Sequence, residues 1–290
     1  MKTNLKEWWN YSLLKQQWTR FVKNKAAVVS GVFLILLYLT MALAPHLTPY
    51  DPMEIHLLDK LKGPNETYWL GTDDLGRDVL SRLIMGSRVS LTIGFIAAGL
   101  SMIIGVWMGL MAGFFGKAVD KIIMGLVDVL MSIPPLLLIL AVVAIVEPKL
   151  INIMIVLGFT MWARYARVVR GSVLSLREQT FVEGARAIGA SRWRIMARYL
   201  LPNVLAPVIV IATLNVAGAI LLESSLSFLG YGVQPPTPSW GSMIGAGRKF
   251  LRQAPHLATS AGLAIFFTVL AFNLLGDGLR DALDPRQKNR

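Results

Sequence analysis

The chain has 290 residues, of which 54% are hydrophobic and only 16% are charged. Soluble domains carry about a quarter charged residues, so the surplus apolar surface must face a medium other than water. The formal net charge is +12, but Lys and Arg do not form one patch interleaved with aromatic residues, which argues against a nucleic-acid-binding protein. The absence of cysteine excludes disulfides, thiolate catalysis and Cys-ligated metals. The composition predicts an integral membrane protein.

The first predicted element, residues 1–25, mixes aromatic and basic residues and is expected to be an amphipathic helix lying in the cytoplasmic membrane interface, in contact with lipid. The first transmembrane helix follows at 26–44. Ala42–Ala44 resembles a signal-peptide cleavage site, but the long apolar run and the following Pro45 favour a retained anchor. An extracytoplasmic segment is expected over 45–89.

A core of five further helices is expected over 90–275, because about 20 apolar residues are needed to cross the hydrocarbon layer. Its predicted spans are Leu91–Phe115, Ile122–Val146, a weaker segment from Pro148 whose clean apolar run is Leu150–Ala163, Val204–Leu222 and Ala258–Leu275. The weaker segment is short enough to be re-entrant, and Pro134-Pro135 should kink the span that contains it. The predicted fold class is an all-α polytopic membrane protein with six transmembrane helices.

The distribution of basic residues predicts the orientation. Most of the 29 Lys and Arg residues lie in four stretches that share one side, namely Lys2–Lys25, 116–121, Arg164–Arg198 and Arg280–Arg290. Cytoplasmic loops carry an excess of Lys and Arg, so both termini, including the tail 276–290, are expected in the cytoplasm. A second extracytoplasmic loop is then expected over 223–257, in which Gln234–Gly241 should be rigid and non-helical because it is rich in proline.

The longest polar interruption between spans is the expected cytoplasmic loop 171–203. Thr180 and Glu183 fit a capping box that would start a helix at Phe181. Gly189 can end that helix, since glycine readily takes the left-handed conformation found at helix ends.

The same loop should contain a second helix. Ser191 can cap a helix over Arg192–Leu201, and Pro202 is expected to mark its end and the entry to the next span. Two short helices joined by a tight bend would thus present a group of basic and aromatic side chains, Arg186, Arg192, Trp193 and Arg194, to the cytoplasm.

The run E-G-A-R-A-I-G-A-S-R-W-R-I-M-A-R-Y-L-L-P, from Glu183 to Pro202, resembles the EAA loop of bacterial ATP-binding cassette (ABC) importer permeases. That pattern is Glu-Ala-Ala, three residues, Gly, nine residues, Ile, one residue and Leu-Pro. The match is in register at Glu183, Ala185, Gly189, Leu201 and Pro202. The chain departs from it at Gly184, which replaces the first Ala, and at Tyr199, which replaces the Ile.

The resemblance implies a type I ABC importer permease fold, in which this loop docks onto a separate ATPase. The docking loop would comprise Glu183, Gly184, Ala185, Arg186, Ala187, Ile188, Gly189, Ala190, Ser191, Arg192, Trp193 and Arg194. The resemblance also implies two ATP-binding subunits, a second homologous permease subunit forming a heterodimer, and an extracytoplasmic substrate-binding protein. The chain has no G-x-x-x-x-G-K-[ST] phosphate loop, so ATP and Mg²⁺ are expected on the partner subunits and no catalytic residue, cofactor or metal is expected here.

Three further stretches narrow the resemblance. They are Leu70–Leu91, Leu226–Gly241 and Asn273–Arg286. Together they resemble the second permease subunit of prokaryotic dipeptide, oligopeptide and nickel importers, which implies a place in the cytoplasmic membrane. Dipeptides or oligopeptides are the expected substrate, with nickel, another metal chelate or an oligosaccharide as alternatives.

The remaining acidic residues have local explanations. A cluster of three, Asp73, Asp74 and Asp78, could supply acid–base carboxylates, but capping of a helix that begins near Leu75 is favoured. A second group, Asp277, Asp281 and Asp284, lacks the spacing of a calcium-binding EF-hand loop and is expected on a short, solvated cytoplasmic helix. The three histidines, His46, His56 and His256, lie far apart near span ends and do not predict a metal site.

Within the predicted spans, Gly105, Gly109 and Gly113 share one helix face, where a partner helix, expected from the second permease, can approach closely. Asp128 and Glu223 are candidates for lining the substrate pathway, since ionisable residues inside membranes are often functional. Asp128 could instead pair at the interface with Lys121, two turns away.

Two other classes remain as alternatives. An intramembrane hydrolase would need a Ser/His pair, H-E-x-x-H or two aspartates in neighbouring spans, whereas no histidine lies in the middle of a predicted span. An ion-coupled carrier acting alone would have more buried charges and would leave the loop 171–203 unexplained.

Overall fold

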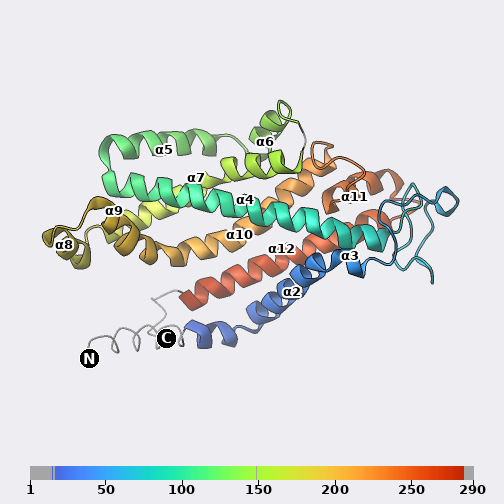
Figure 1. Ribbon diagram of the computed structural model, residues 1–290, viewed down its shortest axis with the longest axis horizontal. Helices are drawn as coiled ribbons and strands as arrows, with labels where there is room; N and C mark the ends of the chain where they lie inside the picture. Colours follow the sequence, from blue (N-terminus) through green and yellow to red (C-terminus); the bar gives the residue numbers. More distant parts are fainter. Residues whose placement is uncertain (1–14, 16, 148, 284–290) are drawn as a thin grey trace.

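The computed structural model describes residues 15, 17–147 and 149–283, and these form an all-helical protein (Figure 1). Its α-helices are α2 (Lys25–Ala42), α3 (Ala44–Leu47), α4 (Val79–Phe115), α5 (Lys117–Ser132), α6 (Pro135–Val143), α7 (Leu150–Leu176), α8 (Thr180–Ala187), α9 (Arg192–Ile195), α10 (Leu201–Phe228), α11 (Trp240–Gly247) and α12 (His256–Leu283). There are also 3-10 turns at Leu57–Asp59 and Arg248–Phe250 and a π-helical turn at Met196–Leu200. The amphipathic helix expected over 1–25 falls largely outside the described residues, although 17–23 are helical.

Within the described ranges, four helices are long and apolar enough to cross a membrane: Lys25–Ala42, Val79–Phe115, Arg192–Phe228 and His256–Leu283. The pair α5 and α6 would make a fifth span if the two together cross once. The helix α7 has the position expected for the weak sixth segment but carries several arginines in its second half. The six-span count therefore stays a prediction.

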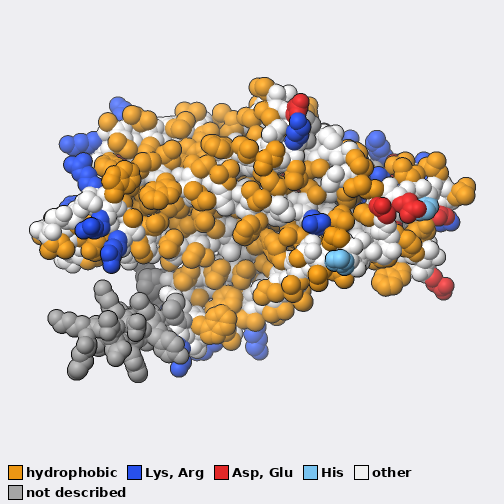
Figure 2. All heavy atoms as spheres, in the orientation of Figure 1, with side chains coloured by type: hydrophobic (Ala, Val, Ile, Leu, Met, Phe, Trp, Pro, Cys, Tyr) orange, Lys and Arg blue, Asp and Glu red, His pale blue; other side chains and the backbone are white. Residues whose placement is uncertain are grey.

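The long helices α4, α7, α10 and α12 run side by side along the long axis of the molecule (Figure 1). At one end, called here the α8 end, lie α8 and α9, and the start of α2 and the end of α12 are the ends of those two helices that lie nearer to it. At the other, called the α11 end, lie α11 and the irregular segment 48–78. Figure 2 shows an apolar surface between the two, with basic side chains gathered at the α8 end and acidic ones at the α11 end. This distribution is typical of a protein that spans a bilayer.

The helices α4 and α7 approach each other closely at the predicted glycine face. A Cβ on Gly105 would lie 2.5 Å from the Trp162 carbonyl oxygen, and one on Gly109 would lie 2.6 Å from that of Ala166. The third glycine, Gly113, faces Val173 in the same way. The close approach was predicted correctly, but the helix that makes it is α7 of the same chain, so this face is not available to a second permease.

The helix α4 begins at Val79 and not at Leu91, so the core begins well before residue 90. The reason is a cap: Asp78 accepts a hydrogen bond of 2.8 Å from the backbone N–H of Ser81. The favoured capping role is confirmed for Asp78, but the helix it caps starts at Val79 and not near Leu75. The backbone there forms a turn, with Gly76 at φ 76°.

The predicted span Ile122–Val146 is broken, not merely kinked. The axes of α5 and α6 differ by 91°. Ile133 is extended because it precedes a proline, and Pro135 starts the new helix.

The short separate helix expected around Asp277 and Asp281 is instead the last part of α12, while Asp284 lies outside the described residues. Packing explains the continuation. Gly276 lies against Leu214 of α10 and Gly278 against Ala27 of α2, so α12 stays in contact with two neighbours to its end.

Candidate functional site

The docking loop, Glu183–Arg194, projects at the α8 end beyond the apolar part of the molecule (Figure 1). Its first helix, α8, begins at Thr180 with Gln179 as the cap residue and no side-chain cap. The Gln179 carbonyl oxygen accepts from the backbone N–H groups of Val182 and Glu183, at 2.9 and 3.2 Å. The predicted capping box is therefore wrong, because Thr180 is already the first helical residue and the cap position falls on Gln179, whose side chain makes no cap hydrogen bond.

Gly189 ends this helix as predicted. Its φ is 76°, the left-handed region that disfavours other residues. The Gly189 N–H donates to the Arg186 carbonyl oxygen and the Ala190 N–H donates to that of Ala185, each at 3.0 Å. A Cβ on Gly189 would meet no atom within 4 Å, so the requirement for glycine comes from the backbone conformation alone.

Ser191 caps α9 as predicted, since its hydroxyl accepts a hydrogen bond of 3.4 Å from the Arg194 N–H. The second helix does not stop at Pro202, however. The chain continues from α9 through the π-helical turn into α10, and the combined helix Arg192–Phe228 has 37 residues. Pro202 lies just after the π-helical turn, so it does not end the helix.

One side of the docking loop is fixed to the helical core. Val182 and Ala185 are buried in a cluster with Leu110 of α4 and Val173 of α7. On the same side, the ring of Trp193 contacts Phe115 edge-to-face at 6.2 Å. The loop is thus packed against the ends of α4 and α7 and cannot shift independently of them.

The other side of the docking loop is open. Ile188 at the bend is 79% exposed, and Trp193 is 60% exposed. The arginines Arg186, Arg192 and Arg194 are exposed beside them. An apolar tip surrounded by cations fits a hollow with an apolar floor and an acidic rim on another protein.

Outside the docking loop, two ion pairs join α5 to α7. Asp128 pairs with Arg167 of α7, and not with Lys121, the alternative partner that the sequence offered. About two turns of α5 nearer the α8 end, Asp120 pairs with Arg170 of α7, and the bond between Arg170 Nη2 and Asp120 Oδ2 is 2.6 Å long. Asp120 was missed because its partner is 50 residues away. Both pairs hold the amphipathic α5 to α7, and nothing here shows the predicted pathway role of Asp128.

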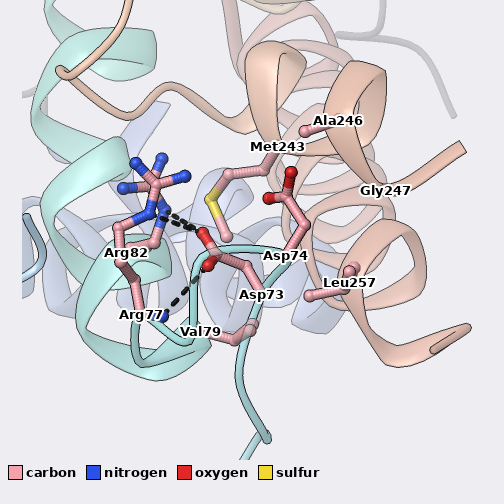
Figure 3. Close-up of a pocket in the computed structure, with 9 residues that line it drawn as sticks. All are labelled: Asp73, Asp74, Arg77, Val79, Arg82, Met243, Ala246, Gly247 and Leu257. Atoms are coloured by element: carbon pink, nitrogen blue, oxygen red, sulfur yellow. Dashed lines mark hydrogen bonds and ion pairs between the residues drawn. The ribbon is translucent and has the colours of Figure 1, made fainter. Parts of the chain in front are cut away.

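At the α11 end, Asp73 organises the entry to α4 (Figure 3). Its carboxylate accepts from the backbone N–H groups of Leu75 and Arg77 at 2.9 and 3.0 Å. It also pairs with Nε of Arg77 at 2.8 Å and with Nε of Arg82 at 3.3 Å. Asp74 points away, toward Met243 of α11, so the two aspartates do not act together.

Glu223 of α10 is fully buried, so the predicted pathway-lining position is wrong for this conformation of the chain. Its carboxylate accepts hydrogen bonds from Ser227 at 2.7 Å, Ser90 of α4 at 3.2 Å and Ser224 at 3.4 Å. The carboxylate therefore joins two long helices at the α11 end.

Two protein-family models match the chain. Residues 105–289 match the model described as "binding-protein-dependent transport system inner membrane component". Residues 12–64 match the model described as "N-terminal TM domain of oligopeptide transport permease C". Together they cover most of the sequence, including the docking loop.

Several curated proteins are similar over nearly their whole length. A glutathione transport system permease protein of Pectobacterium atrosepticum is 43% identical, over 95% of this chain and 92% of that protein. A di/tripeptide transport system permease protein of Pseudomonas aeruginosa is 44% identical, over 96% and 94%. A dipeptide transport system permease protein of Haemophilus influenzae is 41% identical, over 99% and 96%.

Among solved structures, a chain of the MetNI methionine ABC transporter in an inward-facing conformation matches with a TM-score of 0.58. The match covers 70% of this chain and 96% of that one, at 18% sequence identity. This likeness supports the fold.

Proposed function

Because this chain belongs to the family of binding-protein-dependent transport system inner membrane components, we propose that it carries dipeptides or oligopeptides into the cell. It is a multi-pass permease subunit of the inner membrane. The proposed substrate class follows the relatives, whose names specify dipeptides, di/tripeptides and glutathione. Nickel, metal chelates and oligosaccharides are the competing substrates.

The observation that carries the proposal is the docking loop. It presents the exposed Ile188 among arginines on one side and is packed on α4 and α7 on the other. Such a surface would bind an ATP-binding subunit, with ATP and Mg²⁺ held by that partner and not by this chain. Closure of two such subunits would move the loop, and the spans would switch between inward and outward openings.

The proposed topology has six spans with both termini in the cytoplasm. The start of α2 and the end of α12 are the ends of those helices nearer the docking loop, which supports a common side for all three (Figure 1). The basic surface at this end agrees with a cytoplasmic position (Figure 2). The segments 45–78 and 229–255 would then face a substrate-binding protein on the outside.

A second, homologous permease subunit would complete the pathway. The α4 face at Gly109 is covered by α7 and cannot receive it. The exposed apolar side chains of α10 and α12, which include Leu221, Phe266 and Leu270, are available for packing against another membrane helix.

The docking role is tested with two glycines of the same loop. Gly189→Ala introduces a Cβ at φ 76° and costs about 1–2 kcal/mol locally. Gly184→Ala is the matched control, since its Cβ would meet nothing within 4 Å and its φ is ordinary. With co-expressed ATPases and binding protein in proteoliposomes, Gly189→Ala should reduce substrate-stimulated ATP hydrolysis and Gly184→Ala should not.

A third variant tests the partner surface directly. Ile188→Asp changes a side chain that is 79% exposed, so the fold of the chain should be unaffected. The variant should fail to co-purify with the ATPase subunits. Normal co-purification and normal coupling in both Ile188→Asp and Gly189→Ala would rule out the docking role.

The substrate class is tested by uptake of labelled dipeptide, glutathione, nickel chelate and oligosaccharide in the same proteoliposomes. Peptide uptake that needs ATP and a binding protein supports the proposal. Uptake of nickel or an oligosaccharide alone would overturn the peptide assignment, and uptake without any ATPase would favour an ion-coupled carrier.

A further inference from the structure

Two hydrogen-bond chains run from the first turn of α11 to the carboxylate of Glu223. In the first, the backbone N–H of Ser242 donates to the Ser239 hydroxyl at 3.2 Å, which donates to the Ser227 hydroxyl at 3.3 Å. Ser227 then donates to Oε1 of Glu223 at 2.7 Å. Each hydroxyl donates once and accepts once, so the chain has one consistent direction.

The second chain ends on the other carboxylate oxygen. The backbone N–H of Trp240 donates to the Ser90 hydroxyl at 3.2 Å, and Ser90 donates to Oε2 of Glu223 at 3.2 Å. A carboxylate only accepts hydrogen bonds, so it is suited to terminate both chains. The chains start at the N-terminal turn of α11, where a helix favours negative charge nearby. Glu223 therefore joins three elements, α4, α10 and α11.

This junction is enclosed by close packing. Ser90, Glu223 and Ser239 are each 0% exposed. A Cβ on Gly241 would lie 2.5 Å from the Ser224 Cα, so the first turn of α11 lies directly on the α10 backbone. Among the residues that the structure describes, no cation pairs with Glu223, and the serines are its only hydrogen-bond donors. The carboxylate thus holds α11 in place and does not face a ligand.

Glu223 also lies near the outer end of the longest continuous helix that leaves the docking loop. The helix Arg192–Phe228 is about 55 Å long at 1.5 Å per residue. It begins within the docking loop at the α8 end and ends beside α11 (Figure 1). The two places where this helix could bend, the π-helical turn and Pro207, both lie in its first half. A displacement of its first turn therefore moves its far end to the extent that these two places stay straight.

We propose that Glu223 is a positioning residue that fixes α11 to the far end of this helix, so that motion at the docking loop reaches the α11 surface. The inference rests on the proposed function, because it assumes that an ATPase moves the docking loop. On this proposal, α11 and the segment 229–239 are the part of the outer surface that moves. A binding protein seated there would sense the state of the ATPases.

The attachment of α11 is tested first. The chain has no cysteine, so single cysteines can be introduced as reporters. Met243→Cys in α11 should react slowly with a maleimide, because Met243 is 7% exposed. Adding Glu223→Ala should raise that rate on the order of tenfold by removing the common acceptor. Leu110→Cys in α4, which is 0% exposed, is the control that must stay protected in both backgrounds.

Two matched comparisons separate positioning from other roles. Ser227→Ala removes one chain, whereas Ser225→Ala removes a hydroxyl that bonds only to Leu221 of its own helix. Glu223→Gln keeps the volume and one acceptor oxygen. Ser227→Ala should expose the α11 reporter and weaken stimulation of ATP hydrolysis by the binding protein, while basal hydrolysis persists. Ser225→Ala should keep both properties, whereas Glu223→Gln, which places an amide donor opposite one of the two chains, should loosen α11 to about the extent of Ser227→Ala.

Two outcomes would overturn the inference. One is an α11 reporter that stays protected in both Glu223→Ala and Ser227→Ala. The other is a loss of transport in Glu223→Gln with α11 still attached, which would show that the charge itself is needed. Failure of the proposed function is distinct, since the unmodified chain would then show no ATPase coupling at all.

Discussion

Replacing Gly109 with alanine should separate α4 from α7. The new Cβ would lie 2.6 Å from the Ala166 carbonyl oxygen and 2.7 Å from the Val169 Cβ. Carbon atoms pack best at about 3.5–4 Å, so α7 must move by about 1 Å. Overpacking of this kind costs about 1–3 kcal/mol. Alanine also favours a helix over glycine by about 1 kcal/mol, so the net loss of stability should be about 0–2 kcal/mol.

Gly99→Ala on the same helix isolates the packing contribution. A Cβ on Gly99 would meet nothing within 4 Å, so this variant should gain up to about 1 kcal/mol from helix propensity alone. The propensity gain is common to both variants, and their difference of about 1–3 kcal/mol measures the contact with α7. Reversible unfolding of the purified chain in detergent micelles provides the two free energies. If the free energies of unfolding of the two variants differ by less than about 0.5 kcal/mol, α7 does not approach α4 as closely as the structure shows.

Three further changes test the ends of the molecule. Ser191→Ala removes the cap of α9 and should cost about 1 kcal/mol, seen as faster amide hydrogen exchange over 192–195; unchanged exchange would contradict the cap. Asp73→Asn leaves the buried Arg82 without its ion pair and should cost roughly 3 kcal/mol in denaturant unfolding. Asp74→Asn, which makes no such pair, should change stability by less than about 0.5 kcal/mol, and equal effects would refute the assignment. Trp193→Ala loses a ring contact with Phe115 worth about 0.5–1.5 kcal/mol, so it should weaken ATPase coupling and lower the free energy of unfolding by about that amount; unchanged coupling with unchanged stability would contradict the contact.

The sequence alone was sufficient for features that depend on near neighbours. Gly189 and Ser191 lie where the backbone needs a left-handed residue and a cap, and each acts on groups within a few residues. The long apolar runs likewise predicted the helices α2, α4, α10 and α12, since residues that cannot face water must be buried or face lipid. The apolar runs did not predict where the helices begin. The apolar run of α4 starts at Leu91, but the helix starts at Val79 because Asp78 caps it.

The tertiary structure alone decided which distant groups meet. Asp128 has Lys121 nearby in sequence but pairs with Arg167, 39 residues away. The α4 face that contains Gly109 packs against α7 of the same chain. Glu223 accepts a hydrogen bond from Ser90, which is 133 residues away in the sequence. These contacts depend on how rigid helices pack side by side, and residue spacing along one helix carries no information about which neighbour comes to lie against it.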